Sequence, residues 1–198
     1  MMQPGFTDPV LDGQSVFRAV LEAMSRPGRV QEISAGLTPP APLHPATAAV
    51  LLTLADAETP VFSDAGAAAA EWLRFHAGCP LVAAPATAAF LLATGTPPAL
   101  EEIGLGSDEA PQEGATLVLQ VASLAEGGAL RLSGPGIEQE HRLQVEGLPE
   151  GFLAARAALT PLYPRGVDII LCAGTRVAAL PRTTVVTALP RTISVTEG

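Results

Sequence analysis

The chain has 198 residues, 48% of them hydrophobic, which suffices for one domain whose core needs no disulfide bonds. Against 20 acidic residues stand 11 basic ones, and the formal charge of −9 repels nucleic acid and anionic membranes, so we expect neither as a partner. All the basic residues are arginine, and without lysine the chain can form neither a Schiff base with pyridoxal phosphate nor a P-loop.

Targeting signals and cysteine chemistry point to the cytoplasm. No stretch reaches the roughly 20 apolar residues of a membrane-spanning helix. The first residues, "MMQPGFTDPVLDGQ", lack the basic region and apolar run of a secretory signal, so a cytoplasmic protein is expected. Cys79 and Cys172 lie near apolar residues, which favours buried free thiols over a disulfide or a catalytic thiolate.

An amphipathic helix is predicted over residues 11–28. Asp12 is positioned to cap its start, and the Pro27–Gly28 pair ends it. Its apolar face is expected to hold five residues at helical spacing: Val16, Phe17, Val20, Leu21 and Met24.

The remaining segments alternate between strand and helix patterns. Further helices are predicted at 45–56, 65–78 and 149–163, with Gly78 closing the second, and a short helix plus an acidic loop at 96–114. Residues 34–45 read as a proline-rich loop. Strands are predicted at 29–33, 80–85, 87–95, 115–124, 128–137 and 140–148, and as a pair joined by "AGT" within 165–184. This order predicts an α/β fold with a mixed sheet flanked by helices, in a single domain over 1–198 with tails at 1–11 and 187–198.

Seven segments follow one another between residues 12 and 186: "SVFRAVLEAMSRPG", "VLLTLADAETPVF", "LRFHAGCPL", "GATLVLQVASL", "LRLSGPGI", "YPRGVDIIL" and "LPRTT". In order and spacing they resemble the PhnH family, a subunit of the bacterial carbon–phosphorus lyase core complex. The resemblance implies a fold similar to that of pyridoxal-phosphate-dependent transferases, without the cofactor. The missing lysine agrees with that loss, and no cofactor is expected.

The resemblance also implies partners and a function. Family members form homodimers and join PhnG, PhnI and PhnJ subunits. With these proteins they support the formation of ribose 1-phosphonate 5-triphosphate from a purine nucleoside triphosphate and an alkylphosphonate. PhnI is the better candidate for the nucleosidase step. An accessory or structural subunit, not catalytic alone, is therefore expected.

The turn "SGPG" at 133–136 is a candidate ligand contact through Gly134 and Gly136. Glycine-rich turns can present N–H groups to an anion. Pro135, however, removes one donor, and no helix N-terminus follows, so a purely structural turn is the favoured interpretation.

The other candidate site residues are three arginines, two threonines and an aspartate that can orient one of the arginines. Asp168 opens an apolar strand and must be paired if it is buried; a structural ion pair with Arg182 is the leading interpretation. Alternatively, Arg182 and the hydroxyls of Thr183 and Thr184 bind an anion while Asp168 orients the guanidinium. Arg74 is either a phosphate or subunit contact or a solvated side chain, and Arg131 points away from the leucine face of its strand.

No catalytic set is evident. His44 and His141 have no paired ligand at metal spacing, so no metal site is predicted, and no catalytic residue is assigned. Two alternatives to the accessory subunit stay open. One is an enzyme or binding protein whose arginines, Arg74, Arg131 and Arg182, converge on a nucleotide or phosphonate pocket at a dimer interface. The other is a transferase-like scaffold that binds a pyridoxal-like ligand without a covalent bond.

Overall fold

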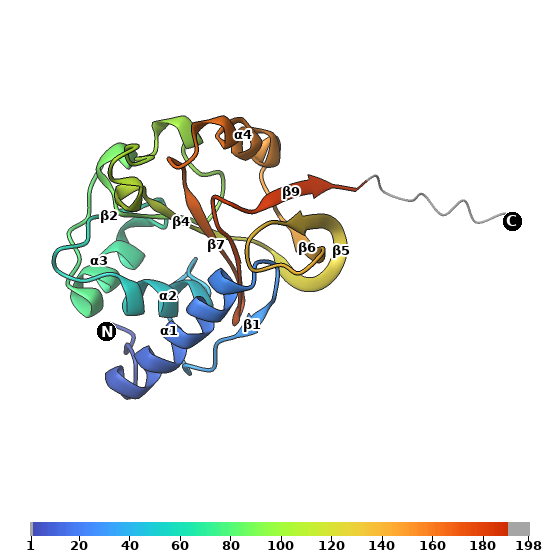
Figure 1. The fold of residues 1–198 in the computed structure, drawn as a ribbon. Helices are drawn as coiled ribbons and strands as arrows, with labels where there is room; N and C mark the ends of the chain where they lie inside the picture. The colour runs from blue at the N-terminus through green and yellow to red at the C-terminus, as the bar shows by residue number, and fades with distance from the viewer. Residues whose placement is uncertain (1, 190–198) are drawn as a thin grey trace, which may run out of the picture.

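A six-stranded mixed sheet divides the molecule into two layers in the computed structural model, which describes residues 2–189 (Figure 1). The strand order is β1–β8–β7–β4–β3–β2. The four strands from β7 to β2 are parallel, whereas β8 and β1 each run antiparallel to their neighbour. The strands are β1 (Gln31–Glu32), β2 (Val61–Ser63), β3 (Phe90–Ala93), β4 (Thr116–Gln120), β7 (Asp168–Ala173) and β8 (Arg176–Leu180). The predicted α/β fold with a mixed sheet is confirmed.

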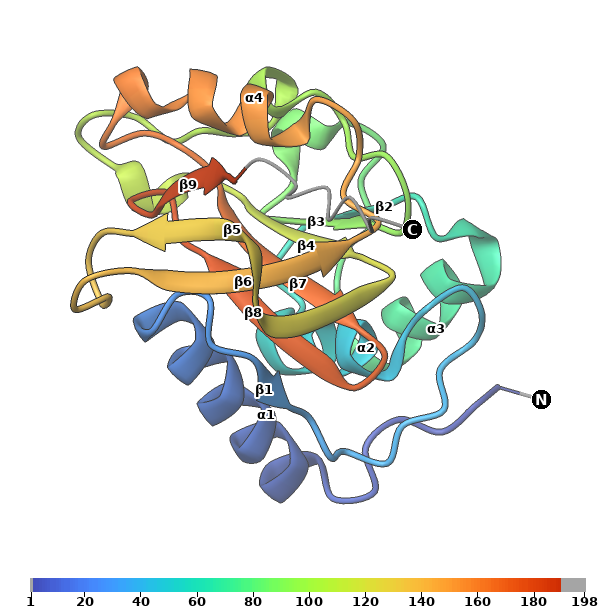
Figure 2. The same ribbon diagram turned by 90° about the vertical axis from the view of Figure 1, so that its right-hand side faces the viewer.

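Helices cover one face of this sheet: α1 (Pro9–Ser25), α2 (Pro45–Leu54) and α3 (Gly66–Ala77). On the other face lie α4 (Phe152–Ala158) and a three-stranded sheet of order β6–β5–β9 (Figure 2). Its strands are β5 (Ser123–Ser133), β6 (His141–Glu146) and β9 (Val185–Ala188). None of the helices within residues 2–189 is long and apolar enough to cross a membrane.

The central strands are mostly apolar, and both of their faces are covered. Successive side chains of a strand point to opposite faces. Val118 of β4 and Ile170 of β7 therefore pack against the three N-terminal helices, whereas their neighbours Leu117 and Ile169 pack on the side of α4. Continuous apolar runs of this kind are typical of parallel strands between two layers.

Helix α1 differs from its prediction at the start. It begins at Pro9, and its N-cap is Asp8, whose side chain accepts hydrogen bonds from the N–H groups of Val10 and Leu11. Asp12, predicted as the cap, instead accepts from the Asp8 N–H at 3.0 Å. Residues 9–11, expected in a tail, are thus helical.

The apolar face of α1 was also predicted too broadly. The helix packs on α2 and β8 and buries Val16, Val20 and Ala23. Each helical step turns the chain by about 100°, so Phe17 and Leu21 point away from this contact, and they are 50% and 55% exposed. The helix therefore carries a second apolar face that no described residue covers.

Other boundaries shifted as well. Between 80 and 95 the strand is confined to β3, with Leu81 making only an isolated bridge to Val61, because prolines nearby lack the N–H that a ladder needs. Short 3₁₀ turns at Leu100–Glu102 and Pro111–Glu113 replace the predicted helix in 96–114. Strands β2 and β9 were not predicted. Residues 187 and 188, expected in a tail, pair with β5, and the rest of that tail from residue 190 lies outside the described residues.

Candidate functional site

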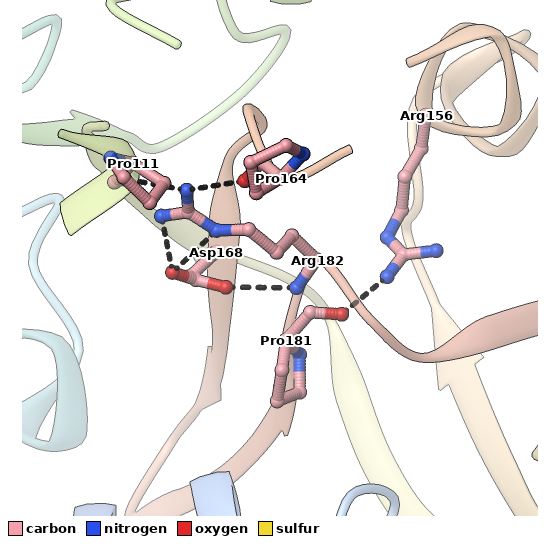
Figure 3. Close-up of polar contacts among 6 residues, drawn as sticks. All are labelled: Pro111, Arg156, Pro164, Asp168, Pro181 and Arg182. Carbon is pink, nitrogen blue, oxygen red and sulfur yellow. Dashed lines mark hydrogen bonds and ion pairs between the residues drawn. The ribbon is translucent and has the colours of Figure 1, made fainter. Parts of the chain in front are cut away.

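Asp168 and Arg182 form the predicted ion pair (Figure 3). Asp168 is the first residue of β7, and Arg182 follows the end of β8, which pairs with β7 in an antiparallel hairpin. Oδ2 of Asp168 accepts hydrogen bonds from Nε and Nη2 of Arg182 at 3.2 and 2.7 Å, and Oδ1 accepts from the Arg182 backbone N–H at 2.7 Å. The Arg182 and Asp168 side chains are only 14% and 21% exposed.

The guanidinium of Arg182 also holds two loops. Its Nη1 donates to the carbonyl oxygens of Pro111 at 2.6 Å and Pro164 at 3.3 Å. All three guanidinium nitrogens therefore have acceptors within the protein. These bonds fix the open end of the β7–β8 hairpin to the two loops. They leave the Arg182 guanidinium with little donor capacity for a ligand.

Arg156 lies beside this pair and was not singled out in the sequence. It extends from α4 to the carbonyl oxygen of Pro181, to which Nη2 donates at 2.7 Å (Figure 3). The residue is only 8% exposed, and its Nε has no hydrogen-bond partner among residues 2–189. Burial lowers the pKa of Arg156, and the charge of Asp168 partly opposes that effect.

A small hollow of about 20 Å³ opens between these arginines and Arg165. Arg165, from the motif "YPRG", makes an ion pair with Asp108 at 3.1 Å between Nε and Oδ1. The wall of the hollow also contains Leu159, Thr160, Tyr163, Gly166 and Val167. The one signal for Arg156 in the sequence is that it is the single charge in the apolar helix "FLAARAAL".

The Gly-Pro-Gly turn packs tightly against the end of α1. Gly136 adopts φ +81°, and a Cβ built on it would lie 2.1 Å from the carbonyl oxygen of Ser25. A Cβ on Gly134 would lie 2.9 Å from the Thr183 carbonyl oxygen, and the Ile137 N–H donates to the Gly134 carbonyl at 3.1 Å. These contacts give the turn a structural role. A role as a ligand contact stays a prediction.

A groove of about 480 Å³ runs beside this turn, with Arg26, Arg29 and His141 on its walls. Its arginines are already paired: Arg26 lies 2.9 Å from Glu22, and Arg29 lies 2.9 Å from Glu126. Glu138 and Glu140 also line the groove. The balance of charges gives it no net attraction for an anion.

The structure assigns Arg74, Arg131 and Arg182 to different surroundings. Arg74 lies exposed on α3, on the helical side of the sheet, whereas Arg131 lies on β5 on the opposite side, 3.9 Å from Glu140 (Figure 2). Arg182 is tied to Asp168. Within one chain the three residues therefore do not gather around one hollow, and their convergence at a dimer interface stays a prediction.

Comparison with known proteins places these features in a family. The model of the bacterial phosphonate metabolism protein PhnH matches residues 4–187. The chain belongs to the PhnH family. The PhnH subunit of alpha-D-ribose 1-methylphosphonate 5-triphosphate synthase from Rhizobium meliloti (strain 1021) is 38% identical over 184 residues, which are 90% of this chain and 92% of that protein. A putative C-P lyase subunit protein, HtxG of Stutzerimonas stutzeri, is 39% identical over 171 residues, 86% of this chain and 84% of its own. The resemblance drawn from the seven segments is confirmed.

This PhnH family member has a further hollow, of about 420 Å³, at the carboxyl ends of β3 and β4. Ligands of open α/β sheets commonly bind at such an edge. The Gln120 side chain on its wall is occupied, however. Oε1 of Gln120 accepts from the His44 N–H at 2.8 Å and from the Thr47 hydroxyl at 2.9 Å, and Nε2 donates to the Pro42 carbonyl at 2.8 Å.

His44 is likewise held in place at this edge. Its Nδ1 accepts a hydrogen bond from the Gly174 N–H at 3.2 Å, and burial lowers its pKa, so the imidazole is neutral near pH 7. No three metal-binding side chains come together within residues 2–189. His44 and Gln120 thus brace the junction between α2, β4 and the β7–β8 turn.

Proposed function

We infer that this chain is an accessory subunit of a carbon–phosphorus lyase system. With PhnG-, PhnI- and PhnJ-like subunits it would support the formation of ribose 1-phosphonate 5-triphosphate from a purine nucleoside triphosphate and an alkylphosphonate. The observation that carries this proposal is similarity over nearly the full length to a PhnH subunit of the synthase that makes alpha-D-ribose 1-methylphosphonate 5-triphosphate.

The geometry supports an accessory role over independent catalysis. At the two hollows described above, Asp168 is bonded to Arg182, and Gln120 is bonded to the backbone N–H of His44 and to the Thr47 hydroxyl. A general base or nucleophile needs a free position within hydrogen-bond reach of a substrate. The proposal also includes a fold related to that of pyridoxal-phosphate-dependent transferases without the cofactor, and the absence of lysine agrees with the loss of the cofactor.

The outer face of α1 is the surface that we assign to contact with a PhnI-like subunit. This outer α1 face comprises Val10, Phe17 and Leu21, all exposed, with exposed Leu11 beside it. Apolar side chains at helical spacing are the usual anchors of a helix bound in a groove. Two copies of one helix face packed together would bury less than the roughly 800 Å² of surface per partner that a stable interface buries. A groove on a larger partner therefore fits it better than a second copy of the same helix. Homodimerisation, which the family resemblance implies, would use another surface.

Co-expression with PhnG-, PhnI- and PhnJ-like subunits tests the proposal. The chain should co-purify with them in fixed proportion, and the double variant Phe17→Ser/Leu21→Ser should be lost from the complex while its own unfolding transition stays unchanged. Val185→Ser, which alters an exposed apolar residue on β9, is the matched control and should assemble normally. A complex that forms and turns over substrate equally well without this chain would contradict the proposal.

A further inference from the structure

The corner around Arg156 holds one more positive charge than negative charges. Three guanidinium groups line the hollow there, those of Arg156, Arg165 and Arg182. Asp168 neutralises Arg182 at 2.7 Å and Asp108 neutralises Arg165 at 3.1 Å. Arg156 makes no ion pair with any residue between 2 and 189. This local excess is notable in a chain whose formal charge is −9.

Of the three arginines, Arg156 is the one whose charge is least compensated within the protein. It is more than nine-tenths buried, and its one hydrogen bond goes to a neutral carbonyl, that of Pro181. That carbonyl already accepts the N–H of Thr184 at 2.9 Å, so it is shared. A buried charge is ordinarily both paired and fully hydrogen-bonded, and here Nε has neither kind of partner within the described chain.

The dimensions of the hollow restrict what can enter. Its volume of about 20 Å³ is close to the space that one water molecule needs, so it admits a single oxygen atom. The side chains of Tyr163 and Arg165 reach toward solvent at the same place, while Leu159 and Val167 add apolar surface. A ligand would therefore insert one oxygen and keep its remaining atoms at the mouth.

We propose that Arg156 and Arg165 bind a small oxyanion of the phosphate and phosphonate class at this hollow. One oxygen enters the hollow against the guanidinium of Arg156, and a second lies at the mouth beside the guanidinium of Arg165. A tetrahedral group supplies these oxygens in different directions, and the apolar wall accommodates a small organic substituent such as methyl. Arg182 and Asp168 position the site without taking part in binding, because their own groups are occupied.

The site follows from charge and burial within one chain and is independent of the proposed function. Calorimetric titration of the isolated full-length protein with inorganic phosphate and with methylphosphonate should give saturable binding, with acetate binding more weakly. Arg156→Met, which replaces a buried charge by an apolar chain of similar length, should weaken binding by about tenfold or more. Arg165→Gln, a change at the mouth that spares the core, should weaken it several-fold.

Arg131→Gln is the matched control, since it removes an equally charged but half-exposed side chain on β5, and it should bind like the wild type. In NMR spectra the side-chain Nε–H signal that disappears in Arg156→Met should be the one that shifts on adding phosphate. Absence of binding, unchanged affinity in both Arg156→Met and Arg165→Gln, or tighter binding of acetate would overturn the proposal. Co-purification of Arg156→Met with the other subunits is a separate readout, so failure of this site and failure of the proposed function are distinguishable.

Discussion

Asp168 and Arg182 close the open end of the β7–β8 hairpin. The aspartate carboxylate accepts three hydrogen bonds from one arginine, two from its guanidinium and one from its backbone N–H. The same guanidinium reaches the carbonyls of Pro111 and Pro164, which belong to two loops far apart in the sequence. One ion pair thus joins the end of a central hairpin to the surrounding connections.

Removing the charge of Asp168 should destabilise the protein. Asp168→Asn retains an oxygen for the Arg182 N–H but leaves a mostly buried guanidinium without its counter-charge. We expect a loss of about 2–3 kcal/mol in the free energy of unfolding, measured by urea denaturation. Asp108→Asn, at an exposed pair, should cost less than about 1 kcal/mol. An equal effect of the two changes would show that the Asp168 pair contributes no more than a surface contact.

Gly136 should tolerate no side chain. In Gly136→Ala the residue keeps a left-handed backbone, and its Cβ meets the Ser25 carbonyl oxygen, so we expect a loss of about 2 kcal/mol or more. Gly174→Ala is the matched control. It also has a positive φ, of +57°, but a Cβ there meets nothing within 4 Å, so about 1 kcal/mol is expected. Thermal unfolding of both variants measures the difference, and a smaller loss at Gly136 would contradict the tight contact with α1.

Stability should fall in alkaline solution because of Cys172. Burial raises the pKa of its thiol to about 12, from an ordinary value of 9.0. Above pH 9 the unfolded chain loses this proton while the folded chain keeps it, so the stabilisation present below pH 9 is lost progressively toward pH 12. The slope should reach at most about 1.4 kcal/mol per pH unit.

The composition makes this measurement unusually clean. The chain has no lysine, one tyrosine and one other cysteine, Cys79, whose burial also raises its pKa, so few other groups titrate in the same range. Urea denaturation at several pH values should show a shallower alkaline decline in Cys172→Ala than in the wild type. Identical slopes would mean that the thiol is not held in its neutral form.

Stability should also fall in acidic solution, because of His44. Burial lowers the pKa of its imidazole below 6.5, so the unfolded chain binds a proton as the pH falls through 6.5 while the folded chain resists it. Stability that is present above pH 6.5 is therefore expected to decline below it. An NMR titration of the three histidines should place the His44 midpoint under 6.5. A midpoint at or above that value would be inconsistent with its burial at the sheet edge.

Apolar spacing and capping residues in the sequence predicted several helices and strands close to their observed bounds. Helix α3 with its Gly78 cap and the start of α2 at Pro45 lie within a residue of their predicted bounds, and the β7–β8 hairpin lies inside the predicted range 165–184, because capping residues and apolar runs act locally. The rotation of α1 was not accessible in this way. Val16 and Phe17 are adjacent in the sequence and both apolar. Only the positions of α2 and β8 decide that Val16 is buried and Phe17 is exposed.

The sequence by itself determined the family, the α/β class and the exclusion of lysine chemistry, because each follows from residue identity and order along the chain. The sequence also predicted the pair of Asp168 and Arg182. A buried carboxylate needs a cation, and the second strand of the hairpin brings Arg182 back beside Asp168. Only the tertiary structure decided how the remaining arginines are used. Arg156 enters the interior from α4 and Arg165 meets it from a loop, so the excess charge arises from three-dimensional packing that no local pattern encodes.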